Sequence, residues 1–313
     1  MFNVFVTREL PGDGLEKLKQ HCNVEVFPQD RDMTKEELLK IVPKQDALIT
    51  MLSNPIDEEV MAAGPRLKVI ANYAVGFNNI DLQAATKRGI PIVNTPDVLS
   101  DATADLAWAL LMATARRVVE GDQMVRAGEF TGWAPELLLG VEIHGKTLGI
   151  IGAGRIGQAV AQRAAGFKMK TLYYNRNRLP KEVEKECNMA YADLDTLLKT
   201  ADFVSLHCPL TPATKYLIGK RELELMKPTA VLINTARGPV VNETDLVEAL
   251  AEGLIFGAGL DVFEDEPALK PGLADLPNTV LAPHIGSAAW ETRSQMTDMV
   301  ARDVLAALQG KRP

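Results

Sequence analysis

Three polar side chains that could act together follow three separate apolar segments of the chain. Arg237 comes after AVLINTA, Glu266 lies in the acidic loop after GAGLDV, and His284 comes directly after TVLAP. If these segments are strands of one parallel sheet, their carboxyl ends share an edge of that sheet. The three side chains can then face one site.

A guanidinium, an imidazole and a carboxylate together suit one task, which is to hold an acid while a proton moves. Arg237 could grip a carboxylate through paired charge-assisted hydrogen bonds, each worth about 1.5–3 kcal/mol. His284 could donate a proton, which typically contributes about 10²–10⁴-fold to a rate. Glu266 could accept from the other ring nitrogen, fix the tautomer and favour the imidazolium. Taken singly, each is more easily explained as a structural or surface residue, so the prediction rests on the combination.

A glycine-rich segment between two apolar runs predicts a nucleotide site. TLGII leads into GAGRIG, a helix of small residues follows, and a second apolar run occupies 171–174. This order is typical of a dinucleotide-binding fold, with one glycine for the turn, one for the pyrophosphate and one for helix packing. The helix N-terminus would then face the phosphates. The expected ligands are Gly152, Gly154, Arg155, Ile156 and Gly157; the alternative is a plain strand-to-helix turn.

The end of the second apolar run favours NADP(H) over NAD(H). A site for NAD usually has Asp or Glu there to accept from the ribose 2′-hydroxyl. This chain has Asn175, Arg176, Asn177 and Arg178 instead. Guanidiniums suit a 2′-phosphate, and no carboxylate is present to repel it. The alternative is that the arginines form a solvated turn and the coenzyme is NAD(H).

Apolar runs alternate with helical patterns along the whole chain, which indicates α/β architecture with parallel sheets. In the first hundred residues we expect strands near 2–6, 23–27, 46–51, 68–72 and 91–94. Helices fit near 12–20, 34–42, 57–63 and 81–88. Further strands are expected near 203–207, 230–235, 257–261 and 279–282.

Two domains are expected from this pattern. The first segment has no G-x-G-x-x-G, and the last helix, near 288–309, is expected to return to it. The prediction is a discontinuous substrate-binding domain, 1–98 and 286–313, and a dinucleotide-binding Rossmann domain, 99–285. Both would be Rossmann/flavodoxin-like doubly wound parallel sheets, with a cleft between them.

A long apolar helix near 101–119 and an irregular arm over 121–145 predict a homodimer. The helix is apolar on most of its surface, and the arm carries Trp133 and the run Leu137-Leu138-Leu139. Exposed apolar surface of this kind is typical of a subunit contact. The partner would be a second copy bound through 101–145.

Charge and cysteine content exclude several classes of protein. A net charge of −7 over 313 residues disfavours a nucleic-acid surface. The chain begins with a predicted strand rather than a signal peptide, and its most apolar helix is too short for a bilayer, so no membrane is expected. Cys22, Cys187 and Cys208 show no zinc spacing and fit a reducing, cytoplasmic compartment, with no metal.

Five motifs in order give the chain a family resemblance. They are NYAVGFNNID at 72–81, GAGRIG at 152–157, NTARG at 234–238, DVFEDEP at 261–267 and PHIGS at 283–287. Together they resemble the D-2-hydroxyacid dehydrogenase family over essentially the whole chain. Within it, the segments NYAVG, DATAD, YYNRNR and PHIGSA look most like glyoxylate/hydroxypyruvate reductases.

The resemblance implies roles for further residues. Arg237, Glu266 and His284 would be the catalytic trio, and the backbone N–H groups of Val75 and Gly76 would bind the substrate carboxylate. Thr103 and Asp261 would lie near the nicotinamide. Other coenzyme contacts would be Cys208, Pro209, Thr235, Ala236 and Gly286, and other substrate contacts Leu52, Ser53 and Ser287. The two domains would close around the substrate.

The substrate is expected to be a small, unphosphorylated 2-oxo acid, glyoxylate or hydroxypyruvate, reduced with His284 as proton donor. The loop 51–55 has no Lys or Arg to bind a phosphate, although Arg8 leaves phosphoglycerate open. Related eukaryotic enzymes carry an aromatic residue near position 137, where this chain has leucine. The alternatives are an NAD-dependent dehydrogenase of other 2-hydroxy acids and a nucleotide-sensing co-regulator, which the intact trio disfavours.

Overall fold

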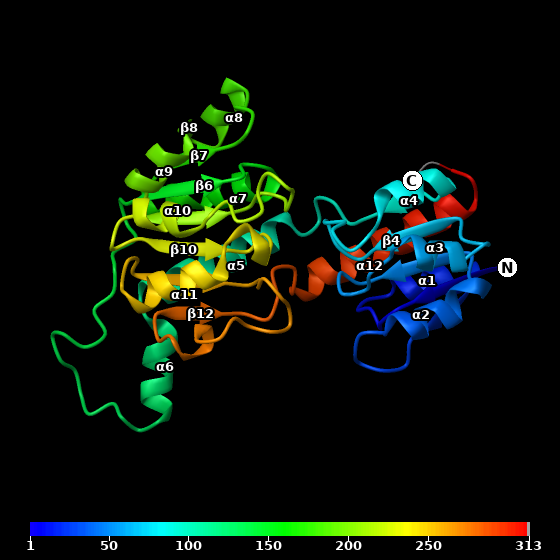
Figure 1. Ribbon diagram of the computed structural model, residues 1–313, viewed down its shortest axis with the longest axis horizontal. Coiled ribbons are helices and arrows are strands. Elements are labelled where there is room, and N and C mark those ends of the chain that lie inside the picture. Colours follow the sequence, from blue (N-terminus) through cyan, green and yellow to red (C-terminus); the bar gives the residue numbers. More distant parts are fainter. Residues whose placement is uncertain (312–313) are drawn as a thin grey trace. The chain divides into compact units, whose positions relative to one another are not determined.

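The computed structural model describes residues 1–311 as two compact units, which are considered separately (Figure 1). Unit 1 contains Met1–Leu99 and the chain from Ser287 onward, and unit 2 contains Ser100–Gly286. Each boundary falls one residue after the position expected from the sequence, so Gly286 belongs to unit 2 and Ser287 to unit 1. Residues 312 and 313, the end of the predicted segment 286–313, lie outside the described residues.

Unit 1 is a parallel sheet with helices on both faces. Its strands, in the order β2-β1-β3-β4-β5, are β1 (Phe2–Val6), β2 (Cys22–Val26), β3 (Ala47–Thr50), β4 (Val69–Asn72) and β5 (Ile92–Val93). Its helices are α1 (Gly14–Lys19), α2 (Lys35–Ile41), α3 (Glu58–Ala63), α4 (Leu82–Arg88) and α12 (Trp290–Leu308), with a 3-10 turn at Val42–Lys44. The central strands are apolar on both faces because both are covered by helices.

The alternation of side chains along β1 divides the core of unit 1 into two layers. Val4 and Val6 pack with α1 and α12, whereas Phe5 packs on the opposite face with α2 and α3. The last helix, α12, therefore completes the layer that α1 begins. A Cβ atom at Gly14 would lie 2.7 Å from the backbone of Thr297, so glycine is what allows α1 and α12 to approach so closely.

Unit 2 is a seven-stranded parallel sheet, in the order β12-β11-β10-β9-β6-β7-β8. Its strands are β6 (Thr147–Ile151), β7 (Lys170–Tyr174), β8 (Met189–Tyr191), β9 (Phe203–Leu206), β10 (Val231–Asn234), β11 (Gly257–Leu260) and β12 (Thr279–Leu281). Its helices are α5 (Ser100–Ala115), α6 (Val118–Arg126), α7 (Arg155–Ala164), α8 (Lys181–Glu186), α9 (Leu194–Thr200), α10 (Lys220–Leu225) and α11 (Glu243–Ala251). Short 3-10 turns cover Ala165–Phe167, Gly238–Val240 and Leu273–Asp275.

The strand order reverses between β6 and β9 in unit 2. The chain runs from β6 outward to β7 and β8, then returns to place β9 on the other side of β6. In doubly wound sheets, ligands bind outside the carboxyl ends of the strands at such a reversal. The glycine-rich loop follows β6 and therefore lies at this position.

The predicted helix over 101–119 is wrong at its end, and the predicted irregular arm is partly helical. α5 ends at Ala115, Arg117 adopts a left-handed φ of 53°, and α6 then runs over the first residues of the expected arm. The returning chain explains the break, because Val141 N donates to the carbonyl of Ala115. The strand β8 was not predicted, since three residues carry little periodicity.

The stretch between α6 and β6, residues 127–146, is a long loop that we call the arm. In Figure 1 the arm and α6 extend away from the seven-stranded sheet. Several of its apolar side chains are exposed, with Trp133 at 84% and Leu139 at 62%. No helix within residues 1–311 combines the length and apolar character that crossing a membrane requires.

Candidate active site

Unit 2 brings His284 and Glu266 into direct contact. His284 follows β12, Glu266 follows β11, and His284 Nδ1 lies 2.8 Å from Glu266 Oε2. The other carboxylate oxygen accepts from the backbone N–H of Phe263 at 3.0 Å, which fixes the plane of the carboxyl group. With Nδ1 donating to the carboxylate, Nε2 is the ring nitrogen left for other chemistry.

Glu266 is held in its charged form by its neighbours. Burial would raise the pKa of this carboxyl, but the hydrogen bond and charge of His284, the Phe263 N–H and the charge of Arg237 together lower it. The carboxylate is therefore charged throughout the neutral range. A charged carboxylate beside the imidazole accepts the Nδ1 proton and fixes the orientation of the ring.

Arg237 belongs to the same electrostatic cluster. It follows β10, and its Nη1 donates to the carbonyl of Ala236 at 2.7 Å. Burial lowers the pKa of the guanidinium, and the charge of Glu266 opposes that effect. A guanidinium remains charged under all ordinary conditions, so the site keeps a fixed, partly desolvated cation close to the His284–Glu266 pair.

The loop that carries Arg237 is fastened by two residues that the sequence analysis did not assign. Asn234 is buried, accepts from Ala236 N at 3.0 Å and donates to the carbonyl of Arg237 at 3.1 Å. A Cβ atom at Gly238 would lie 1.9 Å from the backbone of Phe263. The loops after β10 and β11 therefore interlock, which holds Arg237 relative to Glu266. The sequence feature that could have identified Asn234 is its position, as an asparagine at the end of a buried strand.

Asp261 holds the loop that carries His284. Its two oxygens accept from the backbone N–H groups of Ile285 at 2.7 Å and Gly286 at 2.8 Å. His284 itself has a φ of 55°, a left-handed conformation that is unusual outside glycine and persists where neighbours impose it. Burial raises the pKa of Asp261, against the effect of these donors and of His284. Thr103 also lies next to Gly286, with its side chain 3.4 Å from where a Cβ would be.

The glycine-rich loop has the geometry that its three glycines predict. Gly152 has a φ of 98°, and a Cβ there would lie 2.4 Å from Cys208 N. A Cβ at Gly157 would lie 2.4 Å from the carbonyl of Gly152, so α7 packs closely against the loop. Gly154 is exposed with open space where a Cβ would be, and α7 begins immediately after it with Arg155 and Ile156. An open glycine at a helix N-terminus fits a bound pyrophosphate.

The four residues that follow β7, residues 175–178, differ in the contacts that their side chains make. Asn175 Oδ1 accepts from Ala153 N at 2.7 Å, which ties the strand end to the glycine-rich loop. Arg176 and Asn177 are exposed, and within residues 1–311 the Arg176 guanidinium makes no ion pair or hydrogen bond. Arg178 instead donates to Glu184 through Nε at 2.7 Å and Nη2 at 2.9 Å.

The remaining coenzyme candidates line the ends of β9 and β10. Cys208, Thr235 and Ala236 are buried and Pro209 is exposed. Burial raises the pKa of the Cys208 thiol to about 11, so it is no nucleophile at neutral pH. The sequence analysis missed their neighbour His207, whose ring contacts Ser205 Oγ at 2.8 Å and Thr235 Oγ1 at 3.4 Å. Burial lowers the pKa of His207 to about 3, which keeps the ring neutral.

In unit 1 the backbone of Val75 and Gly76 is shaped by an asparagine network. Asn72, at the end of β4, donates to the carbonyl of Gly76 at 2.6 Å, and Asn79 donates to the side chain of Asn72 at 3.1 Å. The carbonyl of Val75 accepts from Asn94 at 2.8 Å. Within the described chain the N–H groups of Val75 and Gly76 have no acceptor.

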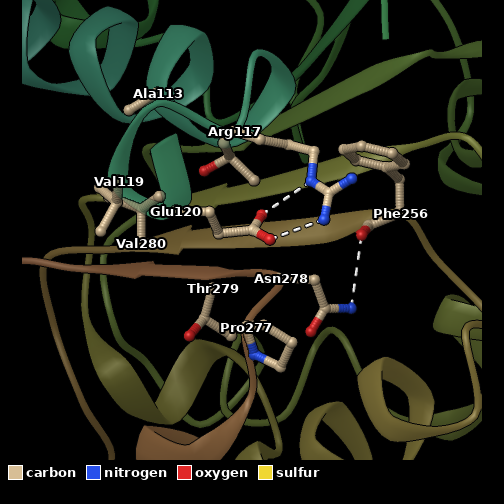
Figure 2. Close-up of a pocket in the computed structure, with 10 residues that line it drawn as sticks. Ala113, Arg117, Val119, Glu120, Phe256, Pro277, Asn278, Thr279 and Val280 are labelled. Carbon is tan, nitrogen blue, oxygen red and sulfur yellow. Dashed lines mark hydrogen bonds and ion pairs between the residues drawn. The ribbon is translucent and has the colours of Figure 1, made fainter. Parts of the chain in front are cut away.

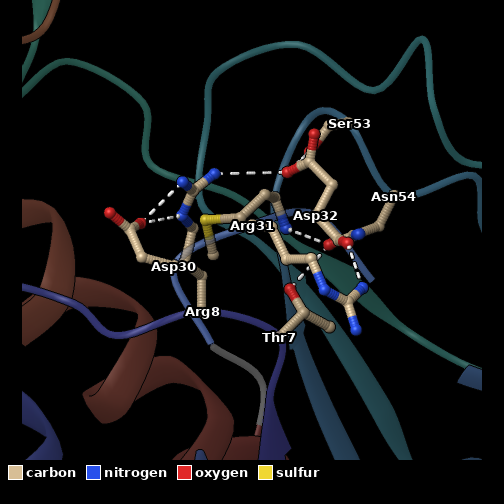
Figure 3. Close-up of polar contacts among 8 residues, drawn as sticks. Thr7, Arg8, Asp30, Arg31, Asp32, Ser53 and Asn54 are labelled. Carbon is tan, nitrogen blue, oxygen red and sulfur yellow. Dashed lines mark hydrogen bonds and ion pairs between the residues drawn. The ribbon is translucent and has the colours of Figure 1, made fainter. Parts of the chain in front are cut away.

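Two other candidates in unit 1 are already engaged. Ser53 donates to Asp32 at 2.7 Å, and the guanidinium of Arg8 binds Asp30 at 2.6 Å and Asp32 at 3.3 Å (Figure 3). Leu52 and Ser287 are half-buried. The cluster of Arg8, Asp30 and Asp32 carries a net negative charge, which would repel rather than bind a phosphate.

A cavity of about 200 Å³ in unit 2 is not part of this arrangement. The ion pair Arg117–Glu120, Phe256 and Asn278 help to line it (Figure 2). Phe256 precedes β11 and Asn278 precedes β12, whereas Glu266 and His284 follow those strands. The cavity thus lies at the amino ends of strands whose carboxyl ends carry the candidate catalytic residues.

Comparison with known proteins assigns the family. Residues 108–286 match the NAD-binding domain of the D-isomer specific 2-hydroxyacid dehydrogenases. A glyoxylate reductase of Thermococcus kodakarensis is 54% identical over 314 residues, which cover 99% of this chain and 94% of that protein. The chain belongs to the D-isomer specific 2-hydroxyacid dehydrogenase family. The resemblance predicted from the five motifs is confirmed.

Solved structures of this family share the fold of both units. A crystal structure from Thermus thermophilus matches with a TM-score of 0.94 and 48% identity, covering 99% of this chain and 98% of that one. An NADPH-dependent glyoxylate/hydroxypyruvate reductase from Sinorhizobium meliloti, in complex with NADP and malonate, matches with a TM-score of 0.84 and 31% identity, covering 97% and 92%. Like other members, the protein is an NAD(P)-dependent oxidoreductase that carries out a 2-hydroxyacid dehydrogenase reaction.

Proposed function

We propose that the protein reduces glyoxylate or hydroxypyruvate to the corresponding 2-hydroxy acid, with NADPH as the preferred reductant. The contact between His284 and Glu266 at 2.8 Å, beside the buried guanidinium of Arg237, carries this proposal. It supplies an anchor for a carboxylate and an oriented imidazole within one cluster. The naming of the Thermococcus relative as a glyoxylate reductase supports the choice of substrate.

Each member of the trio has one step in the reaction. Arg237 binds the substrate carboxylate, and His284 Nε2 gives its proton to the oxygen of the 2-oxo group. Glu266 stabilises the imidazolium before the transfer. When bound, the reduced nicotinamide supplies a hydride to the carbonyl carbon, so carbon gains the hydride and oxygen the proton. Asp261 keeps the His284 loop in place for this transfer.

The residues around the glycine-rich loop fit the proposed coenzyme. The open position at Gly154 and the N-terminus of α7 suit the pyrophosphate. Arg176 follows β7, is exposed, and makes no hydrogen bond or ion pair within residues 1–311; the strand end, residues 175–178, has no carboxylate to repel a 2′-phosphate. The relative from Sinorhizobium meliloti, which binds NADP, supports the preference.

Features of unit 1 support a small substrate without a phosphate. The unused N–H groups of Val75 and Gly76 suit a carboxylate, as the resemblance implies. Arg8, the cation that left phosphoglycerate open, is neutralised by Asp30 and Asp32. A phosphorylated substrate would meet a negatively charged cluster there, so phosphoglycerate is disfavoured.

The assembly that we propose is a homodimer formed through 101–145, in the cytoplasm. Several large apolar side chains of this region are exposed, namely Met112, Val118, Val125, Phe130, Trp133, Leu137 and Leu139. Apolar surface of this extent is rare on a monomer. The three cysteines are buried free thiols, as expected for a reducing compartment.

A substrate panel run with both coenzymes tests the proposal. The purified protein is assayed with glyoxylate, hydroxypyruvate, pyruvate and 3-phosphohydroxypyruvate, each with NADPH and with NADH. We expect the highest kcat/KM for glyoxylate or hydroxypyruvate with NADPH. A higher kcat/KM for the phosphorylated acid would contradict the substrate assignment, and an equal or better NADH reaction would contradict the coenzyme assignment.

A further inference from the structure

The guanidinium of Arg178 is already bound by other residues of the protein, which makes it a poor candidate for binding a ligand. Its Nε and Nη2 both donate to Glu184, and its guanidinium lies over the ring of Tyr191, 5.6 Å from the centroid. Tyr173, which is fully buried, donates its hydroxyl to the same carboxylate at 2.7 Å. We call Tyr173, Glu184 and Tyr191 the Arg178 clamp.

Two of the three clamp residues lie in the sheet, and Glu184 lies on α8. Tyr173 lies on β7, Tyr191 on the neighbouring β8, and their rings meet edge to face at 5.6 Å. The Tyr173 hydroxyl also accepts from the backbone N–H of Leu179 at 2.9 Å, which secures the residue after Arg178. The Glu184 carboxyl is only 12% exposed, and Arg178 with Tyr173 lowers its pKa to about 2.

Arg176 has none of these contacts, although both arginines are exposed. Its guanidinium has no hydrogen bond or ion pair among residues 1–311. Arg176 directly follows Asn175, whose side chain is bonded to Ala153 in the glycine-rich loop at 2.7 Å. Of the two guanidiniums after β7, only that of Arg176 makes no hydrogen bond or ion pair within residues 1–311. Its backbone directly follows Asn175, whose position is fixed by the contact with Ala153.

The difference between the two arginines affects how strongly the site recognises a 2′-phosphate. Glu184 lies against the guanidinium of Arg178 and cancels its charge, so a 2′-phosphate gains little attraction from Arg178. To recruit Arg178, the phosphate would have to displace a carboxylate that already uses two N–H groups of the fork. Arg176 can bind a phosphate without breaking any existing bond.

We propose that Glu184 sets the strength of 2′-phosphate recognition by withholding Arg178, so that Arg176 alone discriminates an adenosine 2′-phosphate. Glu184 is a positioning residue that acts through Arg178 and need not touch the coenzyme. This inference rests on the proposed preference for NADP(H). It predicts that the natural chain recognises the 2′-phosphate less strongly than its own two arginines would allow.

The test measures binding of coenzyme fragments, without turnover. Calorimetry gives the affinity for adenosine 2′,5′-bisphosphate and for adenosine 5′-monophosphate, and their ratio reports recognition of the 2′-phosphate. In E184Q we expect this ratio to rise about tenfold, the effect of one added charge-assisted bond. In R178Q it stays within about twofold of the natural protein, and in R176Q it falls about tenfold or more.

The double variant E184Q/R178Q separates release of Arg178 from simple loss of a negative charge. If Glu184 acts by withholding Arg178, the gain seen in E184Q disappears in the double variant. A gain that persists there, an unchanged ratio in E184Q, or a loss in R178Q as large as in R176Q would each overturn the inference. Higher salt should reduce the E184Q gain, because the released cation is exposed.

A matched control uses the pair Arg31–Glu37 in unit 1. This carboxylate also binds a guanidinium with both oxygens, and Arg31 lowers its pKa to about 2. E37Q therefore removes an equivalent ion pair and should leave the ratio unchanged. The Arg178 side chain is 57% exposed, so its pair contributes little to stability and E184Q is expected to fold. Should E184Q fail to fold, R178Q still tests the inference, because a loss there as large as in R176Q overturns it.

The outcomes also separate this inference from the proposed function. If the natural protein binds both fragments equally and R176Q loses nothing, the NADP(H) preference fails. A tenfold gain in E184Q that requires Arg178 would in that case support the withholding of Arg178 by Glu184 and refute the discrimination by Arg176. If the preference holds and E184Q shows no gain, the clamp alone is refuted.

Discussion

At the scale of single residues, the hydrogen bond between His284 Nδ1 and Glu266 Oε2 decides which ring nitrogen can meet a substrate. It commits Nδ1 and leaves Nε2. The same bond, with the Phe263 N–H, keeps Glu266 charged despite its partial burial. The cluster therefore consists of a fixed carboxylate, an oriented imidazole and a nearby guanidinium.

Replacing Arg237 by alanine should remove the anchor for the substrate carboxylate. Two charge-assisted hydrogen bonds are lost, so we expect kcat/KM for glyoxylate to fall at least about 10²-fold, mainly through a higher KM. Steady-state kinetics at saturating coenzyme would show this. Kinetics close to those of the natural protein would remove Arg237 from the account.

The variant E266Q should change the pH dependence of reduction. The lowered pKa of Glu266 keeps the carboxylate charged even as pH falls below neutral, so its negative charge faces His284, the proposed proton donor, at every pH assayed. Glutamine keeps the shape but not the charge, so we expect kcat/KM for reduction to decline at a lower pH than in the natural protein. An unchanged profile would leave Glu266 as a structural residue.

At the scale of elements, the loops after β10, β11 and β12 are held to one another by backbone contacts. Asn234 fastens the Arg237 loop, and Gly238 lets it lie against the backbone of Phe263. Asp261, after β11, binds the N–H groups that follow His284. Each catalytic loop is thus positioned by its neighbour rather than by its own strand alone.

The variant G238A tests this interlock. A methyl group 1.9 Å from the Phe263 backbone must push the loops apart, and overpacking of this kind costs about 1–3 kcal/mol of stability. We expect a lower unfolding midpoint and a loss of activity larger than the loss of folded protein. G166A is the control, since a Cβ there meets nothing within 4 Å. Full activity in G238A would show that the loops do not need this contact.

The sequence could predict most of the elements because those depend on local patterns. Apolar runs of four or five residues located the central strands, and the residues that follow those strands gave Arg237, Glu266 and His284 as candidates, of which the fold brings His284 and Glu266 into contact. It could not predict the break after Ala115, which depends on a hydrogen bond from Val141, distant in the sequence. Nor could it show that Arg178 and Arg8 are neutralised, because Glu184, Asp30 and Asp32 reach them only through the fold.

At the scale of the whole molecule, α6 and the arm expose large apolar side chains that packing within residues 1–311 does not cover. Val125, Phe130, Trp133 and Leu139 are each more than half exposed. The net charge of −7 keeps copies apart unless a specific apolar contact brings them together. These observations support the proposed homodimer.

We expect light scattering to give a mass twice that of the 34.1 kDa chain. The double variant W133E/L139E should be monomeric, because two charges in an apolar contact are costly to bury. L82E is the control, since Leu82 is an exposed leucine of α4 in unit 1. A natural protein that is monomeric at micromolar concentration would contradict the proposal.

The most direct test of the central claim is the rate of glyoxylate reduction by H284Q at saturating NADPH. Because the account makes His284 the proton donor, kcat should fall about 10²–10⁴-fold while binding of adenosine 2′,5′-bisphosphate is retained. H21Q, which alters an exposed histidine of unit 1, should keep the full rate. Reduction by H284Q at a rate close to that of H21Q would contradict the account.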